Sequence, residues 1–470
     1  MEPCILTTYI WFPMNNHSNK PDPQVQGSLG SLKLSTTPDV SAPVSSSLNT
    51  SALTSNHVVM VLGLGLGSDH FVKELLASGV RLVVLDKSPI ISDELLYQGQ
   101  ASGLLTVLPH DFSDLNAVED AITTYHVTHT LAFPVGRALT FLGQINDRHD
   151  FLGPRLQAID TCTDKVKFHQ LLQAHGLTNP RYMVLPPRTE LKAGTFGLTA
   201  DEIKQAVDTL GIPLVIKPSF GSGSMGVWFC TSESDLQQYV VPERFASQPL
   251  LVDAAIDGTE YLVNLFIDDH GDSHLIGLYA KEMSPLPYRQ EVAYFADDYS
   301  DAYAQMYPYL QKLVAALGKG VHNSFFQCDL ILAPNGDSYA IDVSPRLTGN
   351  AIVLLEQLCG CSPIKTFVSY ILKGQALPPT GTFPVPPQAA VLRFFSFAHT
   401  GTVTAFKNKL SQEELSHVAL VENNISIGDS VGPMTDGQGL ARGLILTSAP
   451  SLKEANDISL HYLSSFVLDY

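Results

Sequence analysis

The chain has 470 residues, of which 45% are hydrophobic and 16% are charged. That length fits about three domains, and the composition excludes a mostly disordered chain. The 28 Lys and Arg against 46 Asp and Glu give a formal net charge of −18, which argues against general binding to nucleic acid or to anionic membranes. The six cysteines form no regular framework, and no apolar run is long enough for a membrane helix. We therefore expect a cytoplasmic protein with reduced thiols.

The beginning of the chain differs in composition from the rest. Residues 15–56 are rich in Ser, Thr, Pro, Asn and Gln and contain few large apolar residues. Such a segment cannot bury enough surface to offset its ordering entropy. We expect residues 1–56 to form a disordered leader.

From His57 onward the pattern is that of an α/β domain. Two apolar runs, 58–62 and 81–86, flank a glycine turn and a helical segment over 69–78. Strand, turn, helix and strand in about thirty residues predict a βαβ unit with a parallel sheet. Further alternation of strand and helix patterns extends the predicted domain over residues 57–159.

The turn Gly63–Gly67, followed by Asp86, has features of a dinucleotide site. Glycines let the backbone approach a pyrophosphate, and an acid after the second strand is placed to hold a ribose. The spacing is Gly-x-Gly-x-Gly, however, without a third glycine three residues after the second. We favour a tight bend that binds no nucleotide, with an NAD-dependent oxidoreductase as the alternative.

Two lysines further along are candidates for phosphate binding. Lys217 ends a strand pattern over 214–217, and the glycine- and serine-rich segment Ser219–Gly226 follows at once. Backbone N–H groups of such a loop can wrap an anion while the lysine neutralises it. Lys165 opens a helix predicted over 164–175. Taken singly, each feature also fits an ordinary hairpin or a solvated helix start.

Carboxylates occupy two predicted hairpins. Asp253 ends a strand over 250–252, and Glu260 opens the next strand, which suits an adenine edge and a ribose diol. Asp329 and Asp342 lie on paired strand patterns, and Ser344 shares a face with Asp342 by the period of two. Two carboxylates and a hydroxyl near a phosphate-binding lysine predict a Mg²⁺ site of hard oxygen ligands.

In this order, the motifs resemble those of the ATP-grasp superfamily, and the resemblance covers nearly everything from Val58 to the C-terminus. It implies a fold of α/β and α+β class, with a Rossmann-like pre-ATP-grasp domain followed by a two-lobed ATP-grasp fold and a C-terminal α+β subdomain. The implied boundaries are 57–159, 160–376 with a central lobe at about 180–255, and 377–470.

The resemblance also implies roles for individual residues. ATP would be bound by Lys165, Lys217, Ser222, Gly223, Ser224, Gly226, Glu260 and the backbone of Asp253, Ala254, Ala255 and Ile256. Asp329, Asp342 and Ser344 would hold Mg²⁺, with Mn²⁺ as an alternative ion. Arg346 and Lys217 would act in catalysis, and Arg289 and Glu291 lie where related ligases bind substrate. Two positions depart from the family pattern, because Asp342 replaces the usual Glu and Ser344 the usual Asn.

The C-terminal segments, such as Ala389–Phe395, are similar to those of carboxylate–amine ligases of the L-amino-acid ligase and biotin carboxylase type. The absence of a biotin-attachment Lys-Met motif argues against a biotin enzyme. The resemblance implies an ATP-dependent ligase that joins small carboxylate and amine substrates through an acyl phosphate, with a homodimer left open. A purine-pathway or carboxylase-type enzyme and a non-catalytic nucleotide-binding regulator remain as alternatives.

Overall fold

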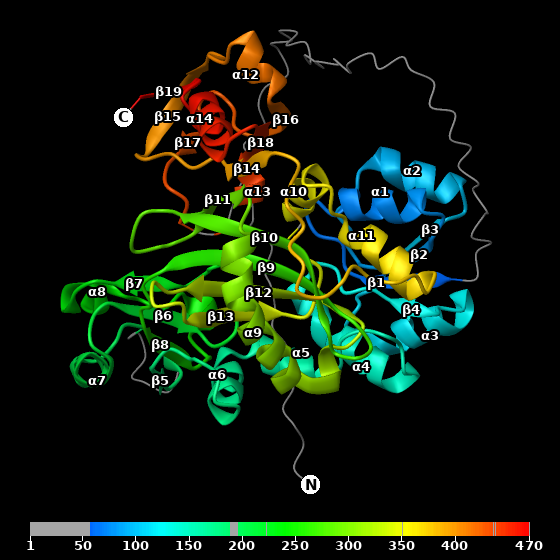
Figure 1. Ribbon diagram of the computed structural model, residues 1–470, viewed down its shortest axis with the longest axis horizontal. Coiled ribbons are helices and arrows are strands. Elements are labelled where there is room, and N and C mark those ends of the chain that lie inside the picture. Colours follow the sequence, from blue (N-terminus) through cyan, green and yellow to red (C-terminus); the bar gives the residue numbers. More distant parts are fainter. Residues whose placement is uncertain are drawn as a thin grey trace, which may run out of the picture. The chain divides into compact units, whose positions relative to one another are not determined.

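The structure is a computed structural model that describes residues 57–188, 196–221, 223–349, 351–435, 437 and 439–469. The predicted leader and Ser222 lie outside the described residues. Figure 1 shows the arrangement of the helices and strands.

The first part of the described chain is a four-stranded parallel sheet in the order β3-β2-β1-β4. Its strands are β1 (Val58–Leu62), β2 (Arg81–Leu85), β3 (Leu105–Leu108) and β4 (His129–Thr130). The associated helices are α1 (Asp69–Ala77), α2 (Asp93–Ala101), α3 (Leu115–Tyr125) and α4 (Leu139–His149). All five residues of β1 are buried, as expected for a strand inside a parallel sheet. The predicted βαβ unit is confirmed.

Asp86 fixes the glycine turn that follows β1. Its Oδ2 accepts the N–H of Leu64 at 2.9 Å and its Oδ1 accepts the N–H of Ser88 at 2.9 Å. The residue is 1% exposed, and Gly63 has a φ of +83° that suits glycine. The acid that a dinucleotide ribose would require is therefore already bound to the backbone of the turn.

The next segment forms a four-stranded antiparallel sheet in the order β5-β8-β6-β7. Its strands are β5 (Tyr182–Leu185), β6 (Leu214–Pro218), β7 (Trp228–Cys230) and β8 (Leu250–Ala254). The helices of this segment are α5 (Leu156–Thr163), α6 (Lys165–Ala174), α7 (Ala200–Leu210) and α8 (Glu233–Gln238). A capping box of Thr199 and Glu202 opens α7.

The largest sheet has eight antiparallel strands in the order β13-β12-β9-β10-β11-β14-β18-β16. They are β9 (Thr259–Ile267), β10 (Ser273–Met283), β11 (Glu291–Ala296), β12 (Ser324–Leu332), β13 (Ser338–Ser344), β14 (Ala389–Phe394), β16 (Val418–Asn423) and β18 (Gly443–Ala449). Because β14 pairs with β11, the C-terminal segment continues the same sheet instead of standing apart from it.

Helices cover both faces of this sheet. On one face, β9 and β12 share a buried apolar cluster with α6 and α9 (Ser300–Leu317). On the other face, β9 shares a cluster with α1, α10 (Ile352–Leu358) and α11 (Pro363–Thr366). Neither β11 nor α9 was among the sequence predictions.

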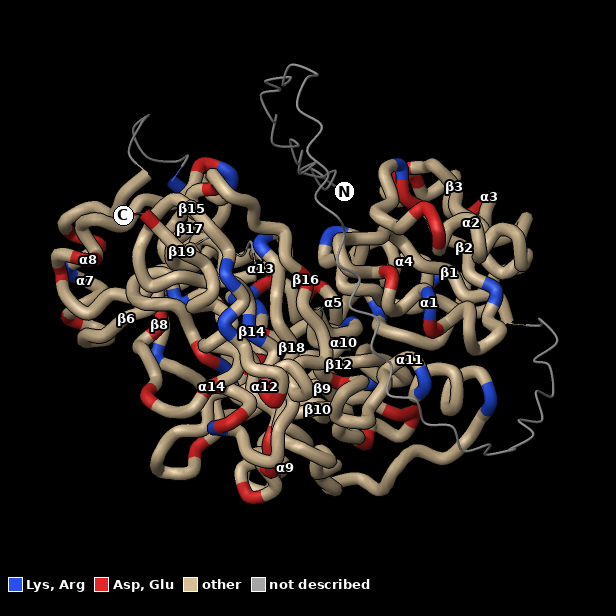
Figure 2. Tube along the Cα trace, turned by 90° about the horizontal axis from the view of Figure 1, so that it is seen from above, with Lys and Arg blue, Asp and Glu red and all other residues tan. Residues whose placement is uncertain are grey.

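The last segment adds a small antiparallel sheet in the order β17-β15-β19. Its elements are β15 (Gly401–Phe406), α12 (Gln412–Ser416), β17 (Ser430–Val431), α13 (Gly439–Arg442), α14 (Leu452–Leu463) and β19 (Phe466–Asp469). Figure 2 shows acidic and basic positions scattered along a trace that is mostly neither. Within the described ranges, none of the helices has the length and apolar character needed to cross a membrane.

Candidate active site

The two predicted phosphate-binding lysines meet at one edge of the eight-stranded sheet. Lys217, at the end of β6, donates from Nζ to the carbonyl of Ile341 at 3.1 Å. Lys165, at the start of α6, places its Nζ 3.3 Å from Oδ1 of Asp342, the next residue on β13. Both lysines are buried. Two cations from separate elements therefore converge on neighbouring residues of β13.

The position of Lys165 follows from local structure. Asp164 caps α6, because its carboxylate accepts the N–H groups of Val166 and Lys167. The backbone N–H of Lys165 donates to the carbonyl of Ser219 at 2.9 Å, and its Nζ donates to the carbonyl of Gly221 at 3.1 Å. The lysine is thereby joined to the beginning of the glycine-rich loop.

That loop lies against the start of β11. The Oγ of Ser224 donates to Glu291, 3.3 Å from Oε1, and Nε2 of Gln290 donates to the carbonyl of Ser224 at 2.8 Å. Gly223, Ser224 and Gly226 all have positive φ angles, between 52° and 78°. These contacts bring the predicted phosphate loop to Glu291, which the sequence analysis assigned to substrate.

Asp329 and Asp342 are direct register partners on β12 and β13, and Ser344 pairs with Gln327. Burial raises the pKa of Asp329 to about 7, with Glu291, Glu260 and Asp342 adding to the rise and Lys281 opposing it. The Oδ1 atom of Asp329 is buried without a hydrogen-bond partner among the described residues. Two carboxylates and a hydroxyl on adjacent strands suit a Mg²⁺ ion, which prefers hard oxygen ligands.

Lys281 on β10 is a central residue that the sequence analysis missed. Its side chain is 1% exposed, and its Nζ lies 3.1 Å from Glu260, 3.5 Å from Glu291 and 2.9 Å from Asp329. Burial alone would lower the pKa of Lys281, but the three carboxylates raise it well above its usual range. The signal available in the sequence was a lysine directly after the largely apolar run of residues 275–280.

Glu260, predicted to hold the ribose, is engaged by two cations. Besides Lys281, the Nη2 of Arg289 lies 3.0 Å from its Oε2. Burial would raise the pKa of Glu260, yet Lys281 and Arg289 lower it below its usual value. Arg289 also stacks over the ring of Phe229 at 5.2 Å. The two predicted substrate residues, Arg289 and Glu291, are thus both tied to the Lys281 cluster.

The predicted adenine edge follows β8. The N–H of Ala254 donates to the carbonyl of Arg181 at 2.8 Å, and that of Ala255 donates to the carbonyl of Pro213 at 3.0 Å. The N–H of Ile256 has no partner among the described residues. Of the backbone N–H groups of Ala254, Ala255 and Ile256, that of Ile256 is therefore available to a ligand.

Arg346 follows β13, the strand that carries the predicted metal ligands Asp342 and Ser344. Burial lowers the pKa of its guanidinium, and Asp342 and Asp329 oppose that change. Its Nη1 donates to the carbonyl of Leu347 at 2.8 Å. The guanidinium therefore belongs to the same charge cluster as the two aspartates.

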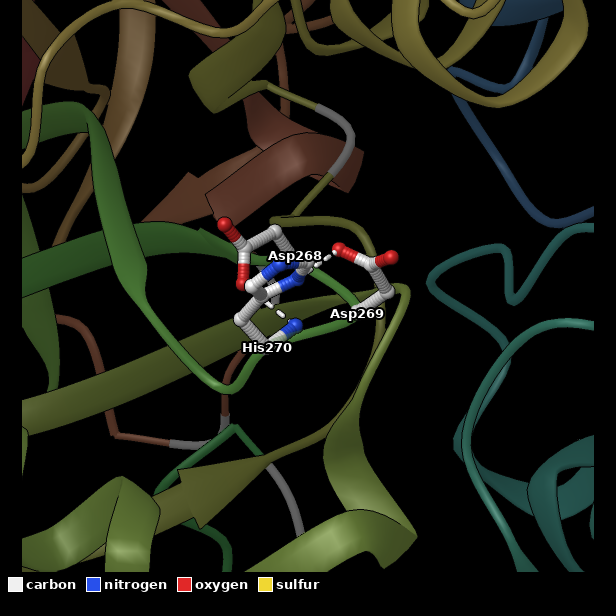
Figure 3. Close-up of side chains that lie close together, drawn as sticks. All are labelled: Asp268, Asp269 and His270. Atoms are coloured by element: carbon white, nitrogen blue, oxygen red, sulfur yellow. Dashed lines mark hydrogen bonds and ion pairs between the residues drawn. The ribbon is translucent and has the colours of Figure 1, made fainter.

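A second group of potential metal ligands lies elsewhere, in the turn between β9 and β10. Figure 3 shows Asp268, Asp269 and His270 close together. Their polar atoms are used within the turn: Nδ1 of His270 lies 2.5 Å from Oδ1 of Asp269, and Oδ2 of Asp268 lies 3.0 Å from Nε2 of His274. This group is a hydrogen-bonded turn and includes neither Lys165 and Lys217 nor the predicted metal ligands of β12 and β13.

Comparison with known proteins bears on these residues. The model of a family described as the ATP-grasp domain matches residues 210–353. The chain is 26% identical over 292 residues to the uncharacterized protein y4rH of Sinorhizobium fredii, covering 59% of this chain and 56% of that protein. It is 23% identical over 239 residues to the D-alanine–D-alanine ligase of Methylibium petroleiphilum, covering 49% of this chain and 72% of the ligase.

The arginine-specific carbamoyl phosphate synthase large chain of Bacillus subtilis is 24% identical over 238 residues, which are 48% of this chain and 20% of that one. The chain therefore spans about half of the first relative and a fifth of the synthase.

Solved structures share the fold. The L-amino acid ligase of Bacillus licheniformis superposes with a TM-score of 0.67 at 18% identity, over 88% of this chain and 99% of the ligase. The biotin carboxylase of Campylobacter jejuni gives a TM-score of 0.59 at 14% identity, over 88% of this chain and 92% of the carboxylase. A biotin carboxylase domain of Hydrogenobacter thermophilus, solved with MgADP and bicarbonate, gives 0.58 at 15% identity, over 88% and 90%.

Proposed function

We propose that the chain is an ATP-dependent carboxylate–amine ligase of the ATP-grasp superfamily, because residues 210–353 match the ATP-grasp domain and the fold is shared with an L-amino acid ligase. One observation carries the proposal. Lys217 and Lys165, from β6 and α6, reach neighbouring residues of β13, where Asp342 is the register partner of Asp329. Phosphate-neutralising cations and hard oxygen ligands therefore share one site.

ATP would lie between the four-stranded antiparallel sheet β5-β8-β6-β7 and the β13 edge of the eight-stranded sheet. Lys165 and Lys217 would neutralise its phosphates, and the loop from Ser222 to Gly226 would cover them. The backbone from Asp253 to Ile256 would meet the adenine, with the unpartnered N–H of Ile256 as the donor. Glu260, held by Lys281 and Arg289, would hold the ribose.

Asp329, Asp342 and Ser344 would hold Mg²⁺ or Mn²⁺. When bound, the ion supplies positive charge on the phosphate oxygens. Asp329 and Asp342 support this assignment because they are register partners on adjacent strands, and Oδ1 of Asp329, although paired with Lys281, accepts no hydrogen bond from the described residues.

The reaction would proceed in two steps. A substrate carboxylate oxygen attacks the γ-phosphorus, the bond to the ADP oxygen breaks, and an acyl phosphate forms. An amine nitrogen then attacks the acyl carbon, the bond to phosphate breaks, and an amide forms as the nitrogen loses a proton to solvent. Arg346 is placed to stabilise the negative charge of both species. The tethered glycine loop would keep water from the intermediate.

The substrates would be amino acids or other small acids and amines in the cytoplasm. Arg289 would receive a carboxylate and Glu291 an ammonium group, after release from the ion pairs that hold them. Nothing in the chain's charge favours nucleic acid, since its formal net charge is −18.

The test is ADP and phosphate release scored over a panel of carboxylates, each with and without amines, and with bicarbonate, formate and ribonucleotides as further arms. We expect release that requires both a carboxylate and an amine. Lys217→Ala should abolish it, whereas Lys204→Ala, at an exposed lysine of α7, should not. Release with bicarbonate or ribonucleotides alone would favour a carboxylase-type or purine-pathway enzyme. Nucleotide binding with no release would favour a regulator.

A further inference from the structure

Asp253, beside the proposed adenine edge, is a buried carboxylate with two basic neighbours. The Nζ of Lys217 lies 2.8 Å from its Oδ2. The Nε2 of His169 lies 3.6 Å from the same oxygen, and the side chain of His169 is 0% exposed. Neither ring nitrogen of His169, nor Oδ1 of Asp253, has a hydrogen-bond partner in the described part of the chain. Such buried polar atoms are costly unless another state satisfies them.

The groups around His169 define its charge state. It lies on α6 one turn after Lys165. Its ring contacts that of Tyr182 on β5 in a tilted arrangement, with the ring centroids 4.7 Å apart, and Asn179 of the following turn donates to its backbone carbonyl. Burial lowers the pKa of His169 to about 4; Asp253 acts against this change, and the positive charges of Lys217 and Lys165 add to it. His169 is therefore neutral while both lysines are free of ligand.

We propose that His169 is a positioning residue for nucleotide binding, which takes up a proton and binds Asp253 when Lys217 turns to the nucleotide phosphates. The inference rests on the proposed function, because phosphates are what draw Lys217 away. Without a replacement, the move would leave a buried carboxylate uncompensated, which is strongly unfavourable. The imidazolium supplies that replacement from 3.6 Å away.

Nucleotide binding is then coupled to proton uptake from solvent. Phosphates neutralise Lys217 and Lys165, the two charges that help to hold the pKa of His169 down, while Asp253 remains. Burial remains the largest cause of the low pKa of His169, and the unopposed charge of Asp253 is what can offset it. If the pKa thereby returns from about 4 to the ordinary value of about 6.5, linkage makes binding about ten-fold tighter at pH 5.5 and leaves it nearly unchanged at pH 7.5.

The experiment measures Mg-ADP affinity by calorimetry at pH 5.5 and pH 7.5 for the wild-type chain, His169→Gln and His175→Gln. His175 caps the same helix and is exposed, so its variant is the matched control. ADP contributes its own protonation equally to all three proteins. We expect the ratio of the two affinities to be about ten-fold larger for the wild type and His175→Gln than for His169→Gln.

Equal ratios in all three proteins overturn the inference and leave the proposed function standing. Absence of Mg-ADP binding by the wild type overturns both. If His169→Gln does not fold, His169→Asn replaces it. In addition, wild-type titrations at pH 5.5 in MES and in ACES count the protons taken up beyond those of ADP. A count of zero contradicts the proposal without any variant.

Discussion

Lys281 reaches across β9 and places its Nζ 2.9 Å from Oδ1 of Asp329. The approach lies outside hydrogen-bond geometry, because the same oxygen has no hydrogen-bond partner in the described residues. A cation from β10 thus compensates the charge of a predicted metal ligand on β12. The carboxylate is held in place by this ion pair.

Replacing Lys281 with Met should destabilise the fold, since it leaves Glu260, Glu291 and Asp329 without their shared cation. Loss of one partner from such a buried group costs about 3–5 kcal/mol. The loss should be smaller at pH 5 than at pH 8, because the carboxylates can then take up protons. Urea unfolding at both pH values measures it.

The control for Lys281→Met is Lys204→Met, because Lys204 pairs with Asp208 at an exposed site on α7. Exposed pairs contribute at most about 1 kcal/mol. Similar unfolding free energies for the two variants would show that the Lys281 cluster does not stabilise the fold.

Glu356 on α10 predicts a pH dependence of stability. The side chain is fully buried, and its Oε1 accepts the Nδ2 of Asn264 at 2.9 Å. Burial raises its pKa to about 8, with Glu74 adding to the rise and Asn264 opposing it. The folded state therefore binds more protons than the unfolded state between the ordinary pKa of about 4.3 and this value. Stability contributed by this group is present below that window and is lost as the pH rises through it.

Glu356→Gln removes the titration while keeping an acceptor for Asn264. We expect the wild type to lose about 4 kcal/mol more than this variant between pH 5 and pH 8.5. Urea unfolding at the two pH values measures the difference. Glu413→Gln, at an exposed residue of α12, is the control and should follow the wild type. Parallel pH profiles for the wild type and Glu356→Gln would contradict a protonated Glu356.

Alanine substitutions at Gly226 and Gly223, two glycines of the proposed phosphate-binding loop, distinguish the effect of backbone strain from that of steric contact. Gly226 has a φ of +78°, and a Cβ there would lie 3.0 Å from the ring of Phe245 and from Pro218. Gly223 has a φ of +63°, but a Cβ there would meet no atom within 4 Å. Alanine costs about 1–2 kcal/mol at either position for the left-handed backbone, and only at Gly226 does it also displace the loop.

We therefore expect Gly226→Ala to raise the KM for ATP several-fold more than Gly223→Ala does. Steady-state ADP release at varied ATP measures both. An equal effect of the two substitutions would mean that the packing of Gly226 on Phe245 does not position the loop.

Local sequence patterns predicted those parts of the fold that depend on near neighbours. The apolar run of β1 and the helix predicted over 164–175 each depend on residues a few positions apart, and the structure contains both, the latter as α6. The contacts of Lys281 and Glu356 could not be predicted from the sequence, because their partners are distant in sequence. Glu356 meets Asn264 across 92 residues, and Lys281 meets Asp329 across an intervening strand. The sheet order brings Lys281 to Asp329, and the packing of α10 against β9 brings Glu356 to Asn264.

The function of the glycine turn Gly63–Gly67 could not be decided from the sequence either, because its glycine spacing left a dinucleotide site as an alternative. Asp86→Asn tests the structural reading, because the amide replaces one of the two oxygens that accept the N–H groups of Leu64 and Ser88. One buried N–H then faces another donor, which costs about 1–3 kcal/mol. We expect that loss in urea unfolding, with an unchanged KM for ATP. Asp120→Asn, exposed on α3, should change neither quantity. Binding of NAD by the wild type that Asp86→Asn weakens would instead restore the dinucleotide site.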